Sequence, residues 1–159
     1  MQLRKLEKKD AEFMLEWMHD PNVYNCLGKD FNSMTIDNCI AFIEGTKEND
    51  SSYHLAITDD CDEYMGTISL KEIDRENKRA EYAIACRTKA MGKGFASFAT
   101  KELFRIAKEE LGLSLIYLNV YETNIRAQKL YIKVGFTKIS KPDFIQEEND
   151  KLIWFEKRL

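Results

Sequence analysis

Met91-Gly92-Lys93-Gly94-Phe95-Ala96 lies between a strand-like run and a long amphipathic helix. Its two glycines let the backbone approach a ligand closely, and the helix that follows directs free N–H groups toward that ligand. This arrangement predicts an anion site, most simply for a phosphate or pyrophosphate. It is not the dinucleotide fingerprint, because Ser97 stands where the third glycine would be, and it lacks the Gly-Lys-Ser/Thr of a Walker A loop. A tight strand-to-helix turn without a ligand is the alternative interpretation.

A second segment, Asn124-Ile-Arg-Ala-Gln-Lys-Leu-Tyr-Ile-Lys-Val-Gly-Phe136, strengthens the first. Together the two segments resemble the signature motifs of the GCN5-related N-acetyltransferase (GNAT) superfamily, whose loop reads Gln/Arg-x-x-Gly-x-Gly/Ala. The last three loop positions, Gly94 to Ala96, fit that pattern, whereas Met91 replaces the usual Gln or Arg. The resemblance covers the chain from about Met65 to Phe136. It is nearest to the branch of ribosomal-protein, polyamine and amino-sugar acetyltransferases.

The resemblance implies that acetyl-CoA is the co-substrate. In the family the loop holds the pyrophosphate, and the strand before it splays from the next strand so that its backbone pairs with the pantetheine amides. The small side chains of Ala83 and Ala85 would leave room for this arm, although they also suit a strand packed under a helix. The residues implied to hold acetyl-CoA are Ile84, Ala85, Cys86, Met91, Gly92, Lys93, Gly94, Phe95, Ala96, Ser97, Asn124, Ala127 and Lys129.

Two residues are candidates for the proton transfers. Tyr131 matches the tyrosine of the family's Leu-Tyr-x-x-x-Gly-Phe segment, and a phenol with a pKa of about 10 can donate its proton to a thiolate as it forms. Spacing alone also suits a core tyrosine on an amphipathic helix. Glu81 is the candidate general base, because Arg79-Ala80-Glu81-Tyr82 resembles the Arg-Ala-Glu-Phe of the polyamine branch. A solvated carboxylate, or an ion pair with Arg79 or Lys78, is the alternative.

The acceptor is expected along the first two helices and their connection. Acids and aromatic side chains there suit a cationic amine or a sugar, and the candidate contacts are Trp17, Asp20, Asn22 and Tyr24, with Asp30 in the same span. The predicted reaction transfers an acetyl group to a primary amine of a small molecule, either a polyamine or an amino sugar or nucleotide sugar. An N-terminal acetyltransferase of a ribosomal or other protein, a non-catalytic acyl-CoA-binding sensor and a structural interaction domain remain alternatives.

Bulk properties narrow the class of protein. The 159 residues predict one domain over residues 1–159. A net charge of −3, from 24 basic and 27 acidic residues, disfavours a dedicated nucleic-acid binder. The four cysteines are widely spaced and there are two histidines, so no metal site is expected and the thiols should be reduced and mostly buried. Neither a membrane-spanning run nor a signal peptide is recognised, which predicts a cytoplasmic protein.

The apolar patterns predict an α+β fold with a mixed, mostly antiparallel sheet flanked by helices, as the GNAT resemblance also implies. Strands are expected at residues 2–6, 53–58, 64–72, 79–87, 115–120, 136–139 and 152–157. Helices are expected after the caps Asp10, Thr35 and Asn124 and after the glycine loop, with glycines 112 and 135 ending the last two. The strand at 152–157 is expected at a sheet edge, where it could pair across a two-fold axis in a homodimer.

Overall fold

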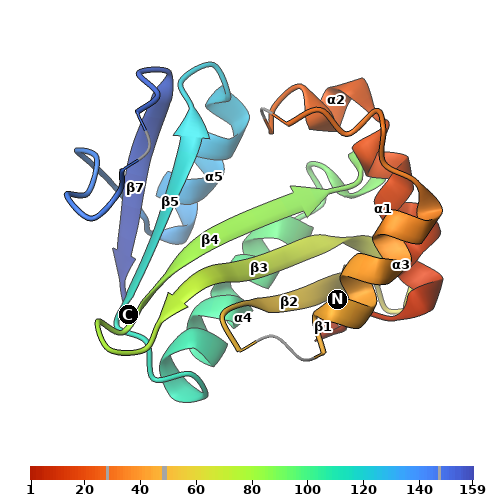
Figure 1. The fold of residues 1–159 in the computed structure, drawn as a ribbon, viewed down its shortest axis with the longest axis horizontal. Helices are drawn as coiled ribbons and strands as arrows, with labels where there is room; N and C mark the ends of the chain where they lie inside the picture. Colours follow the sequence, from red (N-terminus) through yellow and green to blue (C-terminus); the bar gives the residue numbers. More distant parts are fainter. Residues whose placement is uncertain (28, 48–49, 147) are drawn as a thin grey trace.

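Seven strands form one sheet in the computed structural model, which describes residues 1–27, 29–47, 50–146 and 148–159 (Figure 1). They are β1 (Gln2–Lys5), β2 (Tyr53–Thr58), β3 (Tyr64–Asp74), β4 (Arg79–Cys86), β5 (Leu115–Tyr121), β6 (Thr137–Ile139) and β7 (Leu152–Arg158). The order is β1-β2-β3-β4-β5-β7-β6, and every neighbouring pair is antiparallel except β4 with β5. The predicted α+β class is confirmed.

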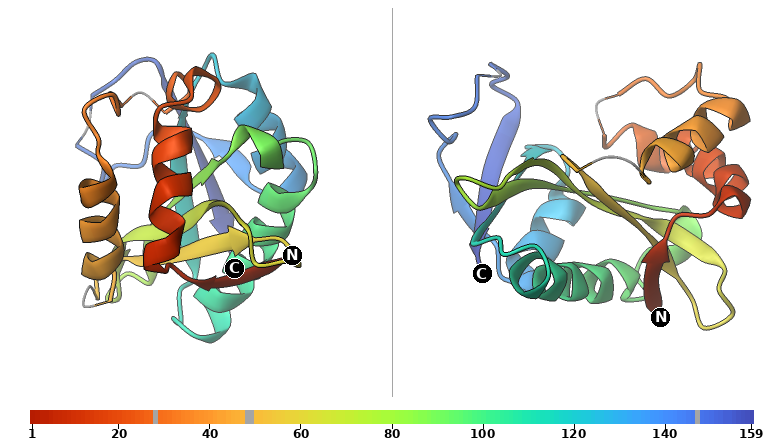
Figure 2. Two further views of the ribbon diagram at one scale, coloured as in Figure 1. Left: turned by 90° about the vertical axis from the view of Figure 1, so that its right-hand side faces the viewer. Right: turned by 60° about the horizontal axis from the view of Figure 1, so that its bottom comes forward.

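Helices pack on both faces of this sheet (Figure 2). One face carries the 3₁₀ helix η1 (Lys8–Asp10), α1 (Ala11–Met18), α2 (Pro21–Tyr24) and α3 (Ile36–Gly45). The other face carries α4 (Phe95–Glu109) and α5 (Ile125–Val134), and a second 3₁₀ helix, η2 (Thr88–Ala90), follows β4. Each face has its own apolar core, and the larger one lies beneath α4 and α5.

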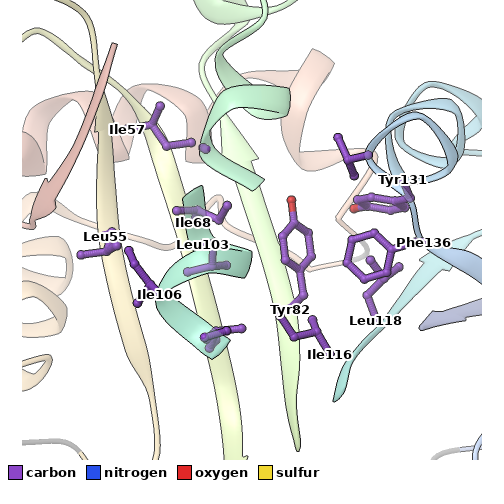
Figure 3. Close-up of a cluster of buried hydrophobic side chains, with 14 of the residues drawn as sticks. Leu55, Ile57, Ile68, Tyr82, Leu103, Ile106, Ile116, Leu118, Tyr131 and Phe136 are labelled. Carbon is purple, nitrogen blue, oxygen red and sulfur yellow. The ribbon is translucent and has the colours of Figure 1, made fainter. Parts of the chain in front are cut away.

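Strand β4 contributes to both cores because side chains alternate between the faces of a strand. Ala80 and Tyr82 are buried on the α4–α5 side, where Tyr82 contacts the ring of Tyr131 (Figure 3). Ala85 packs instead against the core beneath α1 and α3. The same alternation places Glu81 on the α1–α3 face.

The parallel pair β4 and β5 is joined over three residue pairs only, from Arg79 with Leu115 to Glu81 with Tyr117. Beyond that point these two fully described strands have no paired residues and diverge (Figure 1). We call the diverging segments, residues 82–86 of β4 and 118–121 of β5, the fork. The predicted splaying of residues 84–86 from the next strand is therefore confirmed.

The predicted caps are correct at two of three helices. The Thr35 hydroxyl accepts from the Asn38 N–H, and the Asn124 side chain accepts from the Ala127 N–H. Gly112 and Gly135 adopt positive φ at the ends of α4 and α5, as predicted. The strand bounds differ from those expected by two residues at most. The prediction that Asp10 caps α1 is wrong, because no hydrogen bond from that helix reaches its side chain.

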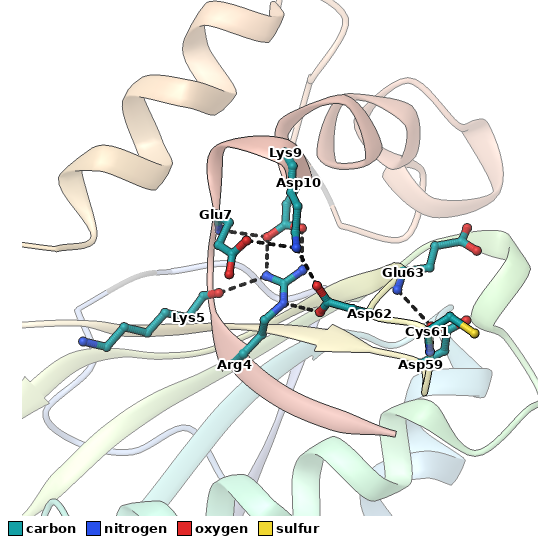
Figure 4. A network of polar contacts seen from close by, with 9 residues as sticks. All are labelled: Arg4, Lys5, Glu7, Lys9, Asp10, Asp59, Cys61, Asp62 and Glu63. Carbon is teal, nitrogen blue, oxygen red and sulfur yellow. Dashed lines mark hydrogen bonds and ion pairs between the residues drawn. The ribbon is translucent and has the colours of Figure 1, made fainter.

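The Asp10 carboxylate serves a different purpose, since it organises the turn before α1 (Figure 4). It accepts from the Glu7 N–H at 2.8 Å and from both terminal nitrogens of Arg4 at 2.8 and 2.9 Å. The Arg4 Nε also donates to Asp62 in the β2–β3 turn at 2.5 Å, and Asp62 accepts from Lys9. This network fixes β1 and the start of α1 against the β2–β3 turn.

Two further expectations need correction. Strand β7 is not a sheet edge, because it pairs with β5 on one side and with β6 on the other, so the edges of the described sheet are β1 and β6. The four cysteines are free, but only Cys39 is buried, while Cys61 is exposed. Among the helices of the described residues, none has the length and apolarity needed to cross a membrane.

Candidate functional site

The loop between η2 and α4 presents unbonded amides to open space. Gly94 caps α4 with a φ of 88°, and Gly92 has a φ of 74°. A Cβ placed on Gly92 would meet no atom within 4 Å, and one on Gly94 would meet only Met1 Cε at 4.0 Å. Within the described residues, no backbone or side-chain acceptor is bonded to the amides of Gly92, Gly94, Phe95, Ala96 and Ser97. This cradle fits a diphosphate.

The residues before the cradle are fixed to the α1 side of the molecule. Arg87 is 6% exposed and lies 4.5 Å from the centre of the Phe13 ring. Its guanidinium donates to Glu16 at 3.0 and 2.7 Å, to Glu63 at 2.8 Å and to the Tyr64 carbonyl at 2.8 Å. These charge-assisted bonds hold the strand-to-loop junction, so the amides that follow are preorganised. No local sequence pattern indicates Arg87 as a functional residue.

The end of β4 forms one arm of the fork. Ile84 and Cys86 pack against the α4–α5 core, and Ala85 packs against the other. Cys86 lies so close to Gly66 of β3 that a Cβ on Gly66 would come within 2.4 Å of the Ala85 carbonyl oxygen. Burial raises the pKa of the Cys86 thiol to about 12. The apolar surroundings of the fork therefore disfavour a thiolate.

Tyr131 reaches the fork from α5 on the α4–α5 face (Figure 3). Its ring is 7% exposed and lies 5.8 Å from the ring of Tyr82, 5.7 Å from that of Phe136 and 6.0 Å from that of Phe155. Burial raises the pKa of the Tyr131 hydroxyl above its ordinary value. In the part of the chain that the structure describes, this hydroxyl has no hydrogen-bond partner. The ring belongs to the core, and the hydroxyl is available to a ligand.

Glu81 lies at the base of the fork, in the last residue pair between β4 and β5. Its carboxylate accepts from the Lys71 Nζ at 2.9 Å, and its side chain is 22% exposed. The alternative of an ion pair with Arg79 is not found, since Arg79 pairs with Asp74 and Glu81 pairs with Lys71. Glu81 and Tyr131 therefore lie on opposite faces of the sheet, on either side of the fork.

Helix α5 closes the other side of the cradle. Asn124 caps it, and its Nδ2 lies 3.5 Å from the Cys26 carbonyl, which links α5 to the segment after α2. Ala127 is half-buried in the α4–α5 core, and Lys129 is exposed. Arg126, which the sequence analysis did not single out, contacts Met91 Sδ from across the loop. The predicted loop and helix residues are thus brought to the same end of the sheet.

The residues predicted to contact the acceptor amine differ in their burial and in their contacts. Trp17 is 6% exposed, and its indole N–H donates to Tyr64 Oη at 3.0 Å, so its position is that of a core residue. The Asp20 carboxylate caps α2 and accepts from the Thr88 hydroxyl, and these bonds lower its pKa. Asn22 is exposed and Tyr24 is half-buried on α2, while Asp30 accepts from the Asn32 N–H. Asp20 thereby joins the α2 segment to the loop.

Comparison with known proteins identifies the family of this chain. Residues 1–137 match the family described as "Acetyltransferase (GNAT) domain". An uncharacterized N-acetyltransferase, p20 of Bacillus licheniformis, is 30% identical over 139 residues, which are 86% of this chain and 78% of that protein. The spermidine N(1)-acetyltransferase of Escherichia coli K12 is 35% identical over 79 residues, which are 49% of this chain and 42% of that enzyme.

A solved structure shares the fold. The spermidine N-acetyltransferase of Vibrio cholerae, solved in complex with CoA and spermine, superposes with a TM-score of 0.84 and 22% identity, over 99% of this chain and 94% of that one. GNAT enzymes use acetyl-CoA as their co-substrate, and the open cradle and the fork fit it. With the match over residues 1–137 and the relative from B. licheniformis, this chain belongs to the GNAT family of N-acetyltransferases.

Proposed function

We propose that this enzyme transfers the acetyl group of acetyl-CoA to a primary amine of a small molecule, either a polyamine or an amino sugar. The observation that carries the proposal is the cradle of unbonded amides beside the fork, with a free Tyr131 hydroxyl within the same end of the sheet. Relatives described as spermidine acetyltransferases support the polyamine class. Acids and aromatics near α2 suit either class.

Acetyl-CoA, when bound, supplies an activated acetyl thioester. The amides of residues 92–97 would hold its phosphates, aided by the N-terminal end of the α4 dipole, worth about 0.3–1 kcal/mol at an exposed helix end. The exposed Lys93 adds a positive charge at the same place. Backbone groups of Ile84, Ala85 and Cys86 that have no partner on β5 are available to pair with the amides of an extended arm.

Tyr131 would donate its proton to the departing sulfur. In water a phenol with a pKa of about 10 is a weaker acid than a thiol with a pKa of about 8.5, so this transfer would be uphill by roughly 2 kcal/mol. Burial at the fork raises the pKa of the nearby Cys86 thiol to about 12, and it raises the pKa of the Tyr131 hydroxyl as well. Because the same burial strengthens the thiolate as a base and weakens the phenol as an acid, the transfer stays about as uphill as in water. A cost of roughly 2 kcal/mol is small for a proton that moves while the carbon–sulfur bond breaks.

The acceptor amine must lose a proton before or during its attack. Deprotonating an amine with a pKa of about 10.4 at pH 7 costs roughly 4–5 kcal/mol. Glu81 would receive this proton, directly or through water, from the α1–α3 face of the sheet. In this arrangement the amine and the departing sulfur are served by groups on opposite faces, so neither proton has to cross the sheet.

The test is a free-thiol assay with acetyl-CoA and a panel of amines: spermidine, putrescine, glucosamine, amino-sugar nucleotides and short peptides. Thiol release with small amines supports the proposal. Release with a ribosomal-protein N-terminal peptide alone would replace it by protein N-terminal acetylation. Acetyl-CoA binding measured by calorimetry without transfer to any amine would instead identify an acyl-CoA sensor.

A further inference from the structure

A row of polar side chains crosses the α1–α3 face of the sheet beside Glu81. His54 of β2 faces Ser69 of β3 in register, with the His54 Nδ1 2.7 Å from the Ser69 Oγ. Lys71 of β3 faces Glu81 of β4, with the Lys71 Nζ 2.9 Å from Glu81 Oε1. We call these four residues the polar row. All four lie outside the motifs of the loop and of α5.

The Lys71–Glu81 end of the row is open to solutes. The side chains of Lys71 and Glu81 are 35% and 22% exposed. The other end is covered by α3, where the Phe42 ring lies 4.9 Å from the His54 ring. Burial, with a smaller effect of Lys71, lowers the pKa of His54, so its imidazole is neutral at pH 7. A solute therefore meets the Lys71–Glu81 ion pair, whereas His54 and the buried Ser69 hydroxyl are bonded to each other.

Two carboxylates on the strands beside Glu81 already have cations from the chain itself. Glu156 of β7, which faces Tyr117, lies 3.5 Å from Arg158 Nε. Asp74 pairs with Arg79 at 3.1 Å. Glu72 of β3, in contrast, is exposed, and within the described residues it has no ion pair. A ligand with several ammonium groups needs carboxylates that have no such partners. Otherwise each ammonium would lie beside the arginine or lysine that already pairs with the carboxylate, and two positive charges brought together repel each other.

We propose that Lys71 determines which amines are accepted: it favours a primary amine that carries a carboxylate, phosphate or hydroxyl group beside it, and it disfavours a polycation. The inference rests on the proposed function, because it takes Glu81 as the group that receives the amine proton. One Glu81 oxygen is held by Lys71, and the other is available to the amine. Lys71 then donates to the neighbouring group of the acceptor, where a second ammonium would instead meet a like charge.

The test compares two amines of nearly equal length and opposite second charge, 4-aminobutyrate and putrescine. With acetyl-CoA saturating, the wild-type enzyme should show a higher kcat/KM for 4-aminobutyrate. Lys71→Gln should shift the ratio of the two kcat/KM values toward putrescine by about tenfold or more, and Lys71→Glu should shift it further. Glucosamine and glucosamine 6-phosphate, compared in the same way with spermidine, distinguish a hydroxyl from a phosphate as the favoured neighbour.

Two control variants separate this effect from charge in general. Lys9→Gln removes an exposed lysine that is paired with Asp62 and Glu7 at the η1 corner, and it should leave the ratio unchanged. Glu72→Gln should also leave it unchanged. A ratio that moves against putrescine in Glu72→Gln would overturn the assignment, because Glu72 would then be the contact for a second ammonium.

The outcomes distinguish this inference from the proposed function. A wild-type enzyme that prefers putrescine, or a ratio that stays within twofold in both Lys71 variants, overturns the role of Lys71 while leaving the acetyltransferase intact. Transfer to none of the amines overturns the proposed function. If the Lys71 variants fail to fold in thermal melts, calorimetry of both amines with the wild-type protein and CoA decides, and tighter binding of putrescine refutes the inference.

Discussion

Replacing Gly94 by Asp tests the anion cradle, and Gly112 supplies a matched control at the other end of the same helix. The two glycines have φ values of 88° and 66°. A Cβ at Gly94 would meet only Met1 Cε at 4.0 Å, and one at Gly112 would meet nothing within 4 Å. Neither substitution creates a clash, and each carries about 1–2 kcal/mol of backbone strain. The two variants should therefore lose similar amounts of folding stability.

The affinity for acetyl-CoA should distinguish the two variants. An Asp at position 94 places a negative charge beside the unbonded amides that would hold the phosphates. Two unit charges about 5 Å apart repel by roughly 1–3 kcal/mol, depending on how far water screens them, which weakens binding roughly 5- to 150-fold. Because exposed charges are screened by salt, the loss should shrink as ionic strength rises toward 1 M. Asp at position 112 is at the far end of α4 and should bind as the wild type does.

The assay is isothermal calorimetry of acetyl-CoA into both variants and the wild type at low and high salt, with thermal melts to establish folding. A folded Gly94→Asp variant with wild-type affinity would refute the cradle as the phosphate site. So would an equal loss of affinity in Gly112→Asp, since the effect would then come from the destabilised helix.

Three further predictions follow from buried groups. Tyr131→Phe should lower kcat by about 10²-fold or more with little change in acetyl-CoA affinity. The control Tyr82→Phe, at a buried neighbour of Tyr131, should mainly lower the melting temperature. An unchanged kcat in Tyr131→Phe would exclude Tyr131 as the general acid. Burial lowers the pKa of His54 in the folded state, so below about pH 6.5 the unfolded chain binds more protons than the folded one. Urea titrations of the wild type should therefore show the free energy of unfolding falling as the pH is lowered below about 6.5, and those of His54→Gln should show a smaller fall. Arg87→Met should cost roughly 2–4 kcal/mol in the same titrations, whereas Arg105→Met, which removes three exposed ion pairs, should leave the unfolding free energy nearly unchanged.

The features that the sequence predicted well are local ones. The caps at Thr35 and Asn124 and the glycines that end α4 and α5 depend on hydrogen bonds and dihedral angles within a few residues, and the structure has them as expected. The prediction that Asp10 caps α1 was wrong because a contact from outside the helix decides where its side chain bonds. Its residue type suits a cap, but an arginine six positions earlier competes for its carboxylate through a contact that no periodicity reveals.

The parts of the site that the sequence did not predict are long-range contacts. The sequence suggested Arg79 or Lys78 as possible partners of Glu81, but the strand register brings Lys71 to it from ten residues away. Arg87 binds Glu16 across 71 positions, and nothing in the local pattern indicates it. Strand β7 was taken for an edge because its place between β5 and β6 is a property of the assembled sheet.

A sheet whose two halves meet over three residue pairs need not open as a single cooperative unit. Strands β1 to β4 form one hydrogen-bonded block, and β5, β7 and β6 form another, with the fork between them. In native-state hydrogen exchange the two blocks would then be separate foldons, and the C-terminal one would open at a lower free energy. A ligand that fills the fork would fasten the blocks together, so its binding would be recorded as slower exchange throughout the C-terminal block, well beyond the atoms it touches.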